Sequence, residues 1–248
     1  MPTEFWGIIP ARYQSTRFPG KPLTPILGKP MYQWVYEQAC QCGQLEGVVL
    51  ATDSDQIADH ARKQGVPVVM TRSDHPSGSD RVREAAEKMG LPDAAVVINI
   101  QGDEPALHPE MLVELIGPFS DPAVQVTTLI RKEDQRAPRD PNQVKVVVDN
   151  AANALYFSRA DIPMNFGGHT TPWYRHIGLY AYRLPVLRRF VDLGPGRLER
   201  IEKLEQLRLL ENGIPIRTVI TRHRSQGVDR PADVAIAQQL IQHRHQQT

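Results

Sequence analysis

Three cations lie close together near the N-terminus. Arg12, Arg17 and Lys21 fall within ten residues of one another. The same segment carries residues that are small or favour tight turns: Ser15, Thr16, Pro19 and Gly20. A triphosphate requires backbone donors and several positive side chains held close together, so this segment is a candidate phosphate-binding loop. A solvated basic surface loop is the alternative, and the spacing is neither that of a Walker motif nor that of a G-x-G-x-x-G dinucleotide loop.

Two aspartates each follow an apolar run and form a candidate metal site. Asp103 comes shortly after the run 95–100, and Asp229 follows the run 216–221 and a glycine-containing turn. Magnesium prefers oxygen ligands and commonly takes one or two carboxylates, with phosphate and water completing the octahedron. The alternatives are that Asp103 shapes a turn and that Asp229 caps a helix near Pro231.

The first half of the chain alternates short apolar runs with helical patterns. Strands are expected over 5–10, 47–52, 66–70 and 95–100. Helices are expected over 31–42, 55–64 and 79–89. This alternation predicts an α/β fold with a mostly parallel sheet covered on both faces. Ligands of such sheets bind at the carboxyl ends of the strands, which is where both candidate sites fall.

The second half predicts a smaller antiparallel sub-region at about 151–200. Strands are expected over 124–131, 144–149, 154–158, 174–182 and 216–221. A helix is expected over 198–211, where Glu205 interrupts the apolar stripe, and another from about 231. The segment 242–248 reads as a polar, solvated tail. We expect a single domain over 1–248, since α/β folds of this size often form one domain.

The bulk composition excludes several classes of protein. A net charge of +1 gives no electrostatic reason to expect a nucleic-acid partner. No apolar run approaches the roughly 20 residues needed to span a bilayer, and the N-terminus does not read as a signal peptide. Cys40 and Cys42 are the only cysteines, too few for a structural zinc site. The expectation is a cytoplasmic protein with reduced thiols and no membrane partner.

The candidate phosphate loop also resembles a known family. Pro10-Ala11-Arg12-x-x-Ser15-x-Arg17-x-Pro19-Gly20-Lys21-Pro22-Leu23 is similar to the opening signature of the cytidylyltransferases for 3-deoxy-manno-octulosonate (Kdo), the CMP-Kdo synthetases. Seven further blocks in order extend the resemblance over most of the chain: Ala51-Thr52-Asp53, His75-x-Ser77-Gly78, Gln101-Gly102-Asp103-Glu104-Pro105, Leu155-Tyr156-Phe157-Ser158-Arg159, Arg175-His176-x-Gly178-x-Tyr180, Leu204-Glu205-Gln206-Leu207-Arg208 and Gly227-Val228-Asp229.

The resemblance implies a Rossmann-like nucleotidyltransferase fold and a specific reaction. The anomeric hydroxyl of Kdo would attack the α-phosphorus of CTP in line, giving CMP-Kdo for lipopolysaccharide biosynthesis and releasing pyrophosphate. Mg²⁺ would be the cofactor, and the 151–200 sub-region could form a homodimer interface. Arg12 and Lys21 would stabilise charge on the phosphates. The alternatives are a related acid sugar, either 8-amino-Kdo or sialic acid, and a non-catalytic nucleotide-binding protein.

The resemblance also implies roles for particular residues. The implied nucleotide-binding residues are Ala11, Arg12, Ser15, Arg17, Lys21, Arg72, Ser77, Gly78 and Arg81. The implied sugar-binding residues are Gln101, Arg159, His176, Tyr180, Glu205 and Gln206. The implied metal ligands are Asp103 and Asp229. Without the resemblance, Arg159 reads as a surface arginine, His176 and Tyr180 as half-buried strand residues, and Glu205 as the partner of another protein residue.

Two positions depart from the family pattern. Ser79-Asp80 stands where the family usually has Thr followed by Glu or Asp, and both exchanges keep the hydroxyl and the carboxylate. Arg230 stands where the family usually has Thr. A cation beside Asp229 could weaken magnesium binding or contact pyrophosphate, so Arg230 puts the role of Asp229 in question.

Overall fold

The computed structural model describes residues 3–14, 18–134, 140–164, 166 and 172–245. The chain groups into two compact units. The first contains residues 1–113 and 223–248, and the second contains 114–222. The prediction of a single domain over 1–248 stays a prediction. Among the described residues, no helix combines the length and the apolar character that crossing a membrane requires.

The first unit contains a parallel sheet. Its strands are β1 (Phe5–Ala11), β4 (Gly47–Thr52), β5 (Val68–Met70) and β6 (Val96–Asn99). They lie in the order β5-β4-β1-β6, and each neighbouring pair is parallel. All four residues of β6 are buried, as expected for a sheet that is covered on both faces.

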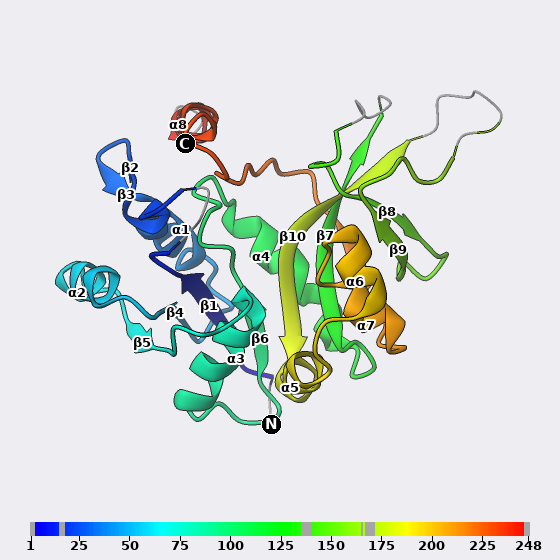
Figure 1. Ribbon diagram of the computed structural model, residues 1–248, viewed down its shortest axis with the longest axis horizontal. Helices are drawn as coiled ribbons and strands as arrows, with labels where there is room; N and C mark the ends of the chain where they lie inside the picture. Colours follow the sequence, from blue (N-terminus) through cyan, green and yellow to red (C-terminus); the bar gives the residue numbers. More distant parts are fainter. Residues whose placement is uncertain (1–2, 15–17, 135–139, 165, 167–171, 246–248) are drawn as a thin grey trace. The chain divides into compact units, whose positions relative to one another are not determined.

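The order of these strands creates a switch point between β1 and β6. From β1 the chain moves outward to β4 and β5, then returns to the other side of β1 to form β6. The connecting helices are α1 (Met31–Ala39), α2 (Asp55–Lys63) and α3 (Gly78–Lys88), which Figure 1 shows around these strands. Before α1 come a short helix, η1 (Lys21–Leu23), and a hairpin, β2 (Pro25–Ile26) and β3 (Lys29–Pro30). Ligands of open α/β sheets bind at such a switch point.

The second unit is mainly antiparallel. Its strands are β7 (Val126–Glu133), β8 (Lys145–Val148), β9 (Ala154–Ser158), β10 (Trp173–Arg183) and β11 (Arg217–Ile220). β10 pairs antiparallel with β7 and β8, β8 pairs antiparallel with β9, and β11 is parallel to β7. The predicted α/β class, a mostly parallel sheet with a smaller antiparallel part, is confirmed.

The predicted helix over 198–211 is wrong. The segment forms two short helices, α6 (Arg197–Glu202) and α7 (Leu207–Glu211), with Lys203 left-handed between them at φ 55°. Arg159 explains the break, because its guanidinium takes the carbonyl oxygens of Glu202 (Nε, 2.8 Å) and Lys203 (Nη2, 3.2 Å). In a continuous helix these carbonyls would accept from amides four residues later.

Three further α-helices belong to the described chain. Two were not predicted: α4 (Pro109–Ile116), which contains the boundary between the units and is followed by the short helix η2 (Gly117–Ser120), and α5 (Leu184–Asp192). The third, α8 (Asp233–His245), lies near the start predicted at about 231.

Helix α8 packs against the N-terminal part of the first unit. Ala237 and Ile241 are buried in a cluster with residues of the N-terminal part: Ile26, Met31, Trp34 and Ala106. Beyond them, Arg244 donates from Nη1 to Gln38 Oε1 and to the carbonyl of Leu107, and from Nη2 to the carbonyl of Ala106, each at 2.7 Å. The prediction of a solvated tail from 242 is therefore wrong at Arg244. Its partners lie more than 100 residues earlier in the sequence, so no local pattern could reveal them.

Arg244→Ala should lower the free energy of unfolding by about 3 kcal/mol, because it leaves buried carbonyl and amide oxygens without their charged donor. Urea unfolding followed by circular dichroism measures this change. Gln242→Ala, at an exposed position of the same helix, is the matched control and should have little effect. Equal stability of the two variants would contradict the fastening role of Arg244.

Candidate active site

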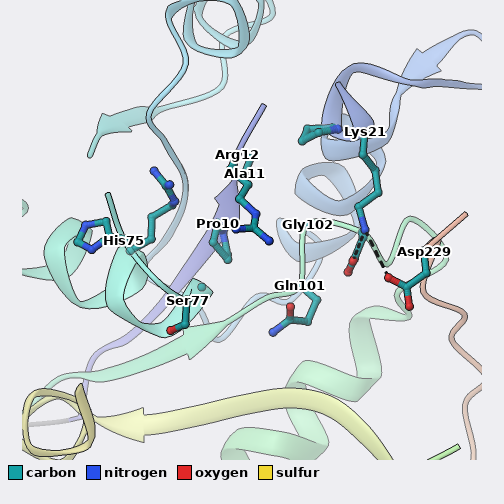
Figure 2. A pocket seen from close by; sticks show the side chains of 13 residues that line it. Pro10, Ala11, Arg12, Lys21, His75, Ser77, Gln101, Gly102 and Asp229 are labelled. Carbon is teal, nitrogen blue, oxygen red and sulfur yellow. Dashed lines mark hydrogen bonds and ion pairs between the residues drawn. The ribbon is translucent and has the colours of Figure 1, made fainter. Parts of the chain in front are cut away.

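A pocket lies at the carboxyl ends of β1 and β6. Its lining residues all belong to the first unit: Pro10, Ala11, Arg12, Lys21, Pro22, His75, Ser77, Gly78, Arg81, Gln101, Gly102, Asp103 and Asp229. Figure 2 shows Lys21 and Asp229 on one side of the pocket, His75 and Ser77 on the other, and residues 10–12 between them. The pocket therefore occupies the switch point of the sheet.

Lys21 holds the two candidate metal ligands together. Its Nζ donates to Asp103 Oδ2 at 2.6 Å and to the carbonyl of Val228 at 2.9 Å, and it lies 3.9 Å from Asp229 Oδ1. The amide of Val228 in turn donates to the carbonyl of Asp103 at 2.8 Å. Gly20, left-handed at φ 70°, precedes η1 and starts the turn that carries the lysine. Segments more than 200 residues apart thus meet at one ammonium group.

The two carboxylates fit a magnesium ion by their chemistry. Their side chains are 30% (Asp103) and 56% (Asp229) exposed, against 16% for Lys21, so both can face a ligand. The described residues contain no cluster of three or more His, Cys, Asp or Glu side chains able to hold a metal. A hard cation here would therefore need other oxygen ligands to complete its shell, such as phosphate and water.

The alternative role for Asp229, a helix cap, is not what the structure shows. Asp233 Oδ2 accepts from the amides of Asp229 and Arg230 at 2.9 and 2.8 Å, at the start of α8. The carboxylate of Asp229 lies instead on the Lys21 side. Arg230 is exposed and is not among the residues that line the pocket. The neighbouring Glu104 accepts from Ser225 Oγ at 2.5 Å, so it braces the same C-terminal segment.

Gly102 lets the turn after β6 pass close to the end of β1. A Cβ atom at this position would lie 2.7 Å from the carbonyl oxygen of Pro10, closer than side chains approach backbone atoms. The absence of a side chain therefore brings Gln101 and Asp103 to the pocket wall.

The opposite wall is formed by the start of α3. Ser77 caps this helix: its Oγ accepts from the amide of Asp80 at 3.3 Å and donates to Asp80 Oδ2 at 2.6 Å. Arg81, only 3% exposed, donates to Asp53 Oδ2 at 3.1 Å and to Thr71 Oγ1. Its charge is thus balanced within the protein, and its backbone segment is held rigidly against β4 and β5.

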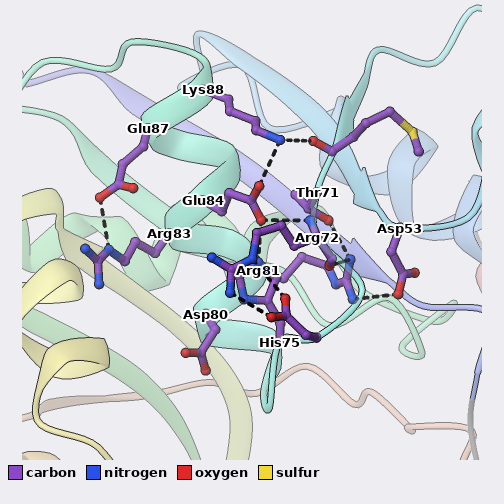
Figure 3. Close-up of polar contacts among 12 residues, drawn as sticks. Asp53, Thr71, Arg72, His75, Asp80, Arg81, Arg83, Glu84, Glu87 and Lys88 are labelled. Carbon is purple, nitrogen blue, oxygen red and sulfur yellow. Dashed lines mark hydrogen bonds and ion pairs between the residues drawn. The ribbon is translucent and has the colours of Figure 1, made fainter.

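Glu84 fastens the loop before α3 to the helix itself (Figure 3). Its carboxylate accepts from the amide of Arg72 at 2.9 Å, from Lys88 Nζ at 2.8 Å and from the ring of His75. Burial alone would raise the pKa of Glu84, but the hydrogen bonds from Lys88, from the Arg72 amide and from His75 outweigh it and lower the pKa to about 2. The carboxylate is therefore ionised at neutral pH.

The pocket brings together most of the predicted nucleotide and metal residues. Among its lining residues are Ala11, Arg12, Lys21, Ser77, Gly78, Arg81, Gln101, Asp103 and Asp229. Arg72 is not one of them, because its side chain is exposed and its guanidinium pairs with Asp74 at 2.9 Å. Ser15 and Arg17 lie outside the described residues. The roles of all these residues stay predictions.

Sequence reasoning missed His75 and Glu84 as site residues. His75 belongs to the block His75-x-Ser77-Gly78, so the resemblance contained the signal, but no role was given to it. For Glu84 the signal was weaker: it lies nine residues after His75 within a predicted helix, and only the folded loop brings the two together.

The remaining predicted sugar residues lie in the second unit. Arg159 donates to the carbonyls of Pro141, Glu202 and Lys203, so three of its five N–H groups are already used within the protein. Gln206 is 6% exposed, and its Nε2 has no hydrogen-bond partner among the described residues. An unpartnered buried donor is costly in the absence of a ligand.

His176 and Tyr180 form a buried pair. The tyrosine hydroxyl lies 2.8 Å from His176 Nε2, and Thr128 Oγ1 lies 3.2 Å from the same nitrogen. Burial lowers the pKa of His176 to about 3. Burial also raises the pKa of Tyr180 well above its usual value, and the charge of Glu205 raises it further. Both rings are therefore neutral near pH 7, and Glu205 lies within their electrostatic reach.

Comparisons with known proteins agree on one family. A family model described as cytidylyltransferase matches residues 6–219. A 3-deoxy-manno-octulosonate cytidylyltransferase of Nitratidesulfovibrio vulgaris is 56% identical over 244 residues, covering 97% of each chain. Its counterpart in Oleidesulfovibrio alaskensis is 56% identical over 241 residues, covering 96% of this chain and 97% of the relative. A solved structure of a CMP:2-keto-3-deoxy-manno-octonic acid synthetase complexed with CTP matches with a TM-score of 0.90 at 40% identity, covering 98% of this chain and all of that one.

Glu84→Gln should destabilise the protein in a pH-dependent manner. The pKa of this carboxyl is lower in the folded chain than its ordinary value of 4.5, so it stabilises the fold above about pH 4.5 and loses that effect as the pH falls through about 2. The difference in unfolding free energy between wild type and variant should therefore shrink over this range, as urea titrations from pH 7 to pH 2 would measure. Glu87→Gln, on the exposed side of the same helix, should show little difference at any pH. A gap for Glu84→Gln that does not vary with pH would contradict the hydrogen-bonding scheme.

Proposed function

We propose that this chain, which belongs to the cytidylyltransferase family, joins CTP to 3-deoxy-manno-octulosonate and releases pyrophosphate. The product, CMP-Kdo, would serve lipopolysaccharide biosynthesis. The observation that carries the proposal is the placement of Lys21 between Asp103 and Asp229, inside a pocket at the switch point of the sheet. The relatives whose names state this reaction match nearly the whole chain.

The triphosphate fits the end of the pocket that carries Lys21. Arg12 is exposed directly after the end of β1, in the middle of the pocket (Figure 2), and adds a second cation. Lysine supplies a compact charge, whereas arginine can donate to two phosphate oxygens at once. Before a nucleotide arrives, Lys21 is neutralised by the two aspartates, so the lysine is held in place for its ligand at little electrostatic cost.

We further propose that Asp103 and Asp229 hold a magnesium ion. Both are carboxylates, both are accessible, and together they supply fewer ligands than the ion requires, which leaves positions for phosphate oxygens and water. When bound, magnesium would supply neutralisation of phosphate charge and a fixed direction for the reacting groups.

The reaction follows from the positions of the chain's own residues. The anomeric hydroxyl of the sugar acid loses its proton to solvent, and its oxygen forms a bond to the α-phosphorus. The bond from that phosphorus to the bridging oxygen breaks, and pyrophosphate departs with that electron pair. Lys21 and Arg12 stabilise the negative charge that grows on the phosphate oxygens. Positioning and electrostatics supply most of the acceleration in phosphoryl-type transfers.

The sugar acid is proposed to contact polar side chains of the second unit. Gln206 has a buried Nε2 that needs an acceptor, and a sugar hydroxyl can provide one. His176 and Tyr180 are neutral and can exchange hydrogen bonds with hydroxyl groups, with Glu205 close to them. Arg159 retains two N–H groups for the substrate carboxylate after its three contacts with backbone carbonyls.

A homodimer is proposed through the region 151–200. Large apolar side chains are exposed there: Leu155 (60%), Met164 (80%) and Phe166 (93%). Apolar groups exposed in this manner are typical of surfaces that are covered by a partner. Light scattering should give the mass of a dimer for the wild type and of a monomer for Met164→Ser combined with Phe166→Ser. A monomeric wild type would contradict the proposal.

Lys21→Ala and Asp103→Asn should each reduce turnover by about 100-fold or more while the protein stays folded. The first removes a cation that stabilises the phosphates, and the second removes a carboxylate ligand of the proposed magnesium ion. Magnesium-dependent pyrophosphate release from CTP measures this, with Kdo, 8-amino-Kdo and N-acetylneuraminate compared as acceptors. Asp59→Asn, which alters an exposed pair with Arg62, is the control and should retain full activity.

The acceptor series separates the alternatives. Activity with Kdo alone supports the proposal, and a preference for 8-amino-Kdo or N-acetylneuraminate reassigns the sugar. Silence of the wild type with all three acceptors would favour a non-catalytic nucleotide-binding protein. Near-normal turnover in Lys21→Ala or Asp103→Asn would remove the assigned phosphate and metal site.

A further inference from the structure

His75 lines the end of the pocket that lies away from Lys21 (Figure 2). Its side chain is 10% exposed, so the ring is held in the wall and does not project into solvent. It precedes the cap of α3 by two residues, in a loop that is fixed at several points. These points are the Ser77 cap, the buried Arg81 and the contacts of Glu84.

Glu84 determines which nitrogen of the imidazole carries hydrogen. The carboxylate is ionised and can only accept, so the ring nitrogen that contacts it, Nε2, must donate. The other oxygen accepts from Lys88 Nζ, which also donates to the carbonyl of Met70 at 2.8 Å, so the glutamate cannot easily turn away. In the neutral ring Nδ1, which is not the nitrogen that contacts Glu84, is then an acceptor.

The chemistry of the two ends of the pocket orients a nucleotide. The cations that phosphates need, Lys21 and Arg12, lie at one end and in the middle (Figure 2). Arg81 also lines the pocket, but its charge is matched by Asp53. The base of a nucleotide bound through its phosphates must therefore lie toward His75. Cytosine presents an amino group at its 4-position, where uracil presents a carbonyl oxygen.

We infer that His75 recognises the exocyclic amino group of cytosine through Nδ1, and that Glu84 is the positioning residue that keeps this nitrogen an acceptor. The inference rests on the proposed function, because it concerns the nucleotide of the same reaction. An acceptor at this place forms a hydrogen bond with the amino group of cytosine and repels the carbonyl oxygen of uracil. It therefore both strengthens the binding of CTP and weakens the binding of UTP.

The test is the ratio of kcat/KM for CTP to that for UTP, measured at pH 8 by pyrophosphate release with Kdo. His75→Phe keeps a ring of similar shape but has no acceptor, and it should lower the ratio about tenfold or more, mainly through a higher KM for CTP. His75→Gln can present an amide oxygen and should restore part of the ratio. Glu84→Gln should also lower the ratio, because a neutral amide no longer dictates the tautomer of the ring. Glu87→Gln, three residues further along α3 and paired with Arg83 outside the pocket, should leave the ratio unchanged.

An unchanged ratio in folded His75→Phe would overturn the inference. If that variant does not fold, Glu84→Gln decides in the same way. A wild type that uses UTP as well as CTP would also overturn it, while the cytidylyltransferase assignment would survive as a broader nucleotidyltransferase. A wild type that uses neither nucleotide defeats the proposed function itself, and this inference falls with it.

Discussion

The ammonium group of Lys21 connects the parts of the first unit on which the site depends. It reaches Asp103 after β6 and the carbonyl of Val228 before α8, while the lysine itself follows the turn at Gly20. A lysine with only 16% of its side chain exposed requires such partners, because an unpaired charge would be strongly unfavourable there. The same need brings two carboxylates from distant segments close together. The arrangement that stabilises the lysine is thus also the arrangement that suits a metal and a triphosphate.

The rest of the first unit keeps this geometry in place. β1 and β6 bring their carboxyl ends side by side, and Gly102 allows the turn after β6 to approach within the reach of Pro10. The family model ends at residue 219, yet Asp229 and α8 belong to the same unit, anchored by Val228 in the core and by Arg244. The C-terminal helix is therefore part of the site's support. On the opposite wall, ion pairs and the Ser77 cap of α3 hold the loop around His75 in place.

Local patterns in the sequence were sufficient for the parallel sheet, and they indicated the phosphate-loop cations and the two aspartates. The other predicted pocket residues came from the family resemblance. Runs such as 47–52 and 154–158 have the bounds that were predicted, because short apolar segments between turn residues leave few alternatives. Long-range polar contacts were not predictable. Arg159 donates hydrogen bonds to the carbonyls at the end of α6, and the helix stops there. Arg244 attaches a polar C-terminal segment to the first unit, and Glu84 accepts from His75, nine residues earlier. In each case the tertiary fold determines the hydrogen-bond partner, and the local hydrophobic periodicity of the sequence gives no indication of it.

The most direct test of the account is the anomalous diffraction of crystals grown with CTP and Mn²⁺, an ion that takes the same oxygen ligands as Mg²⁺. The account predicts an anomalous peak between the carboxylates of Asp103 and Asp229, with the triphosphate on Lys21 and Arg12 and the base against His75. A peak elsewhere, or a nucleotide whose phosphates lie away from Lys21, would contradict the claim that this lysine and its two aspartates form the centre of the site.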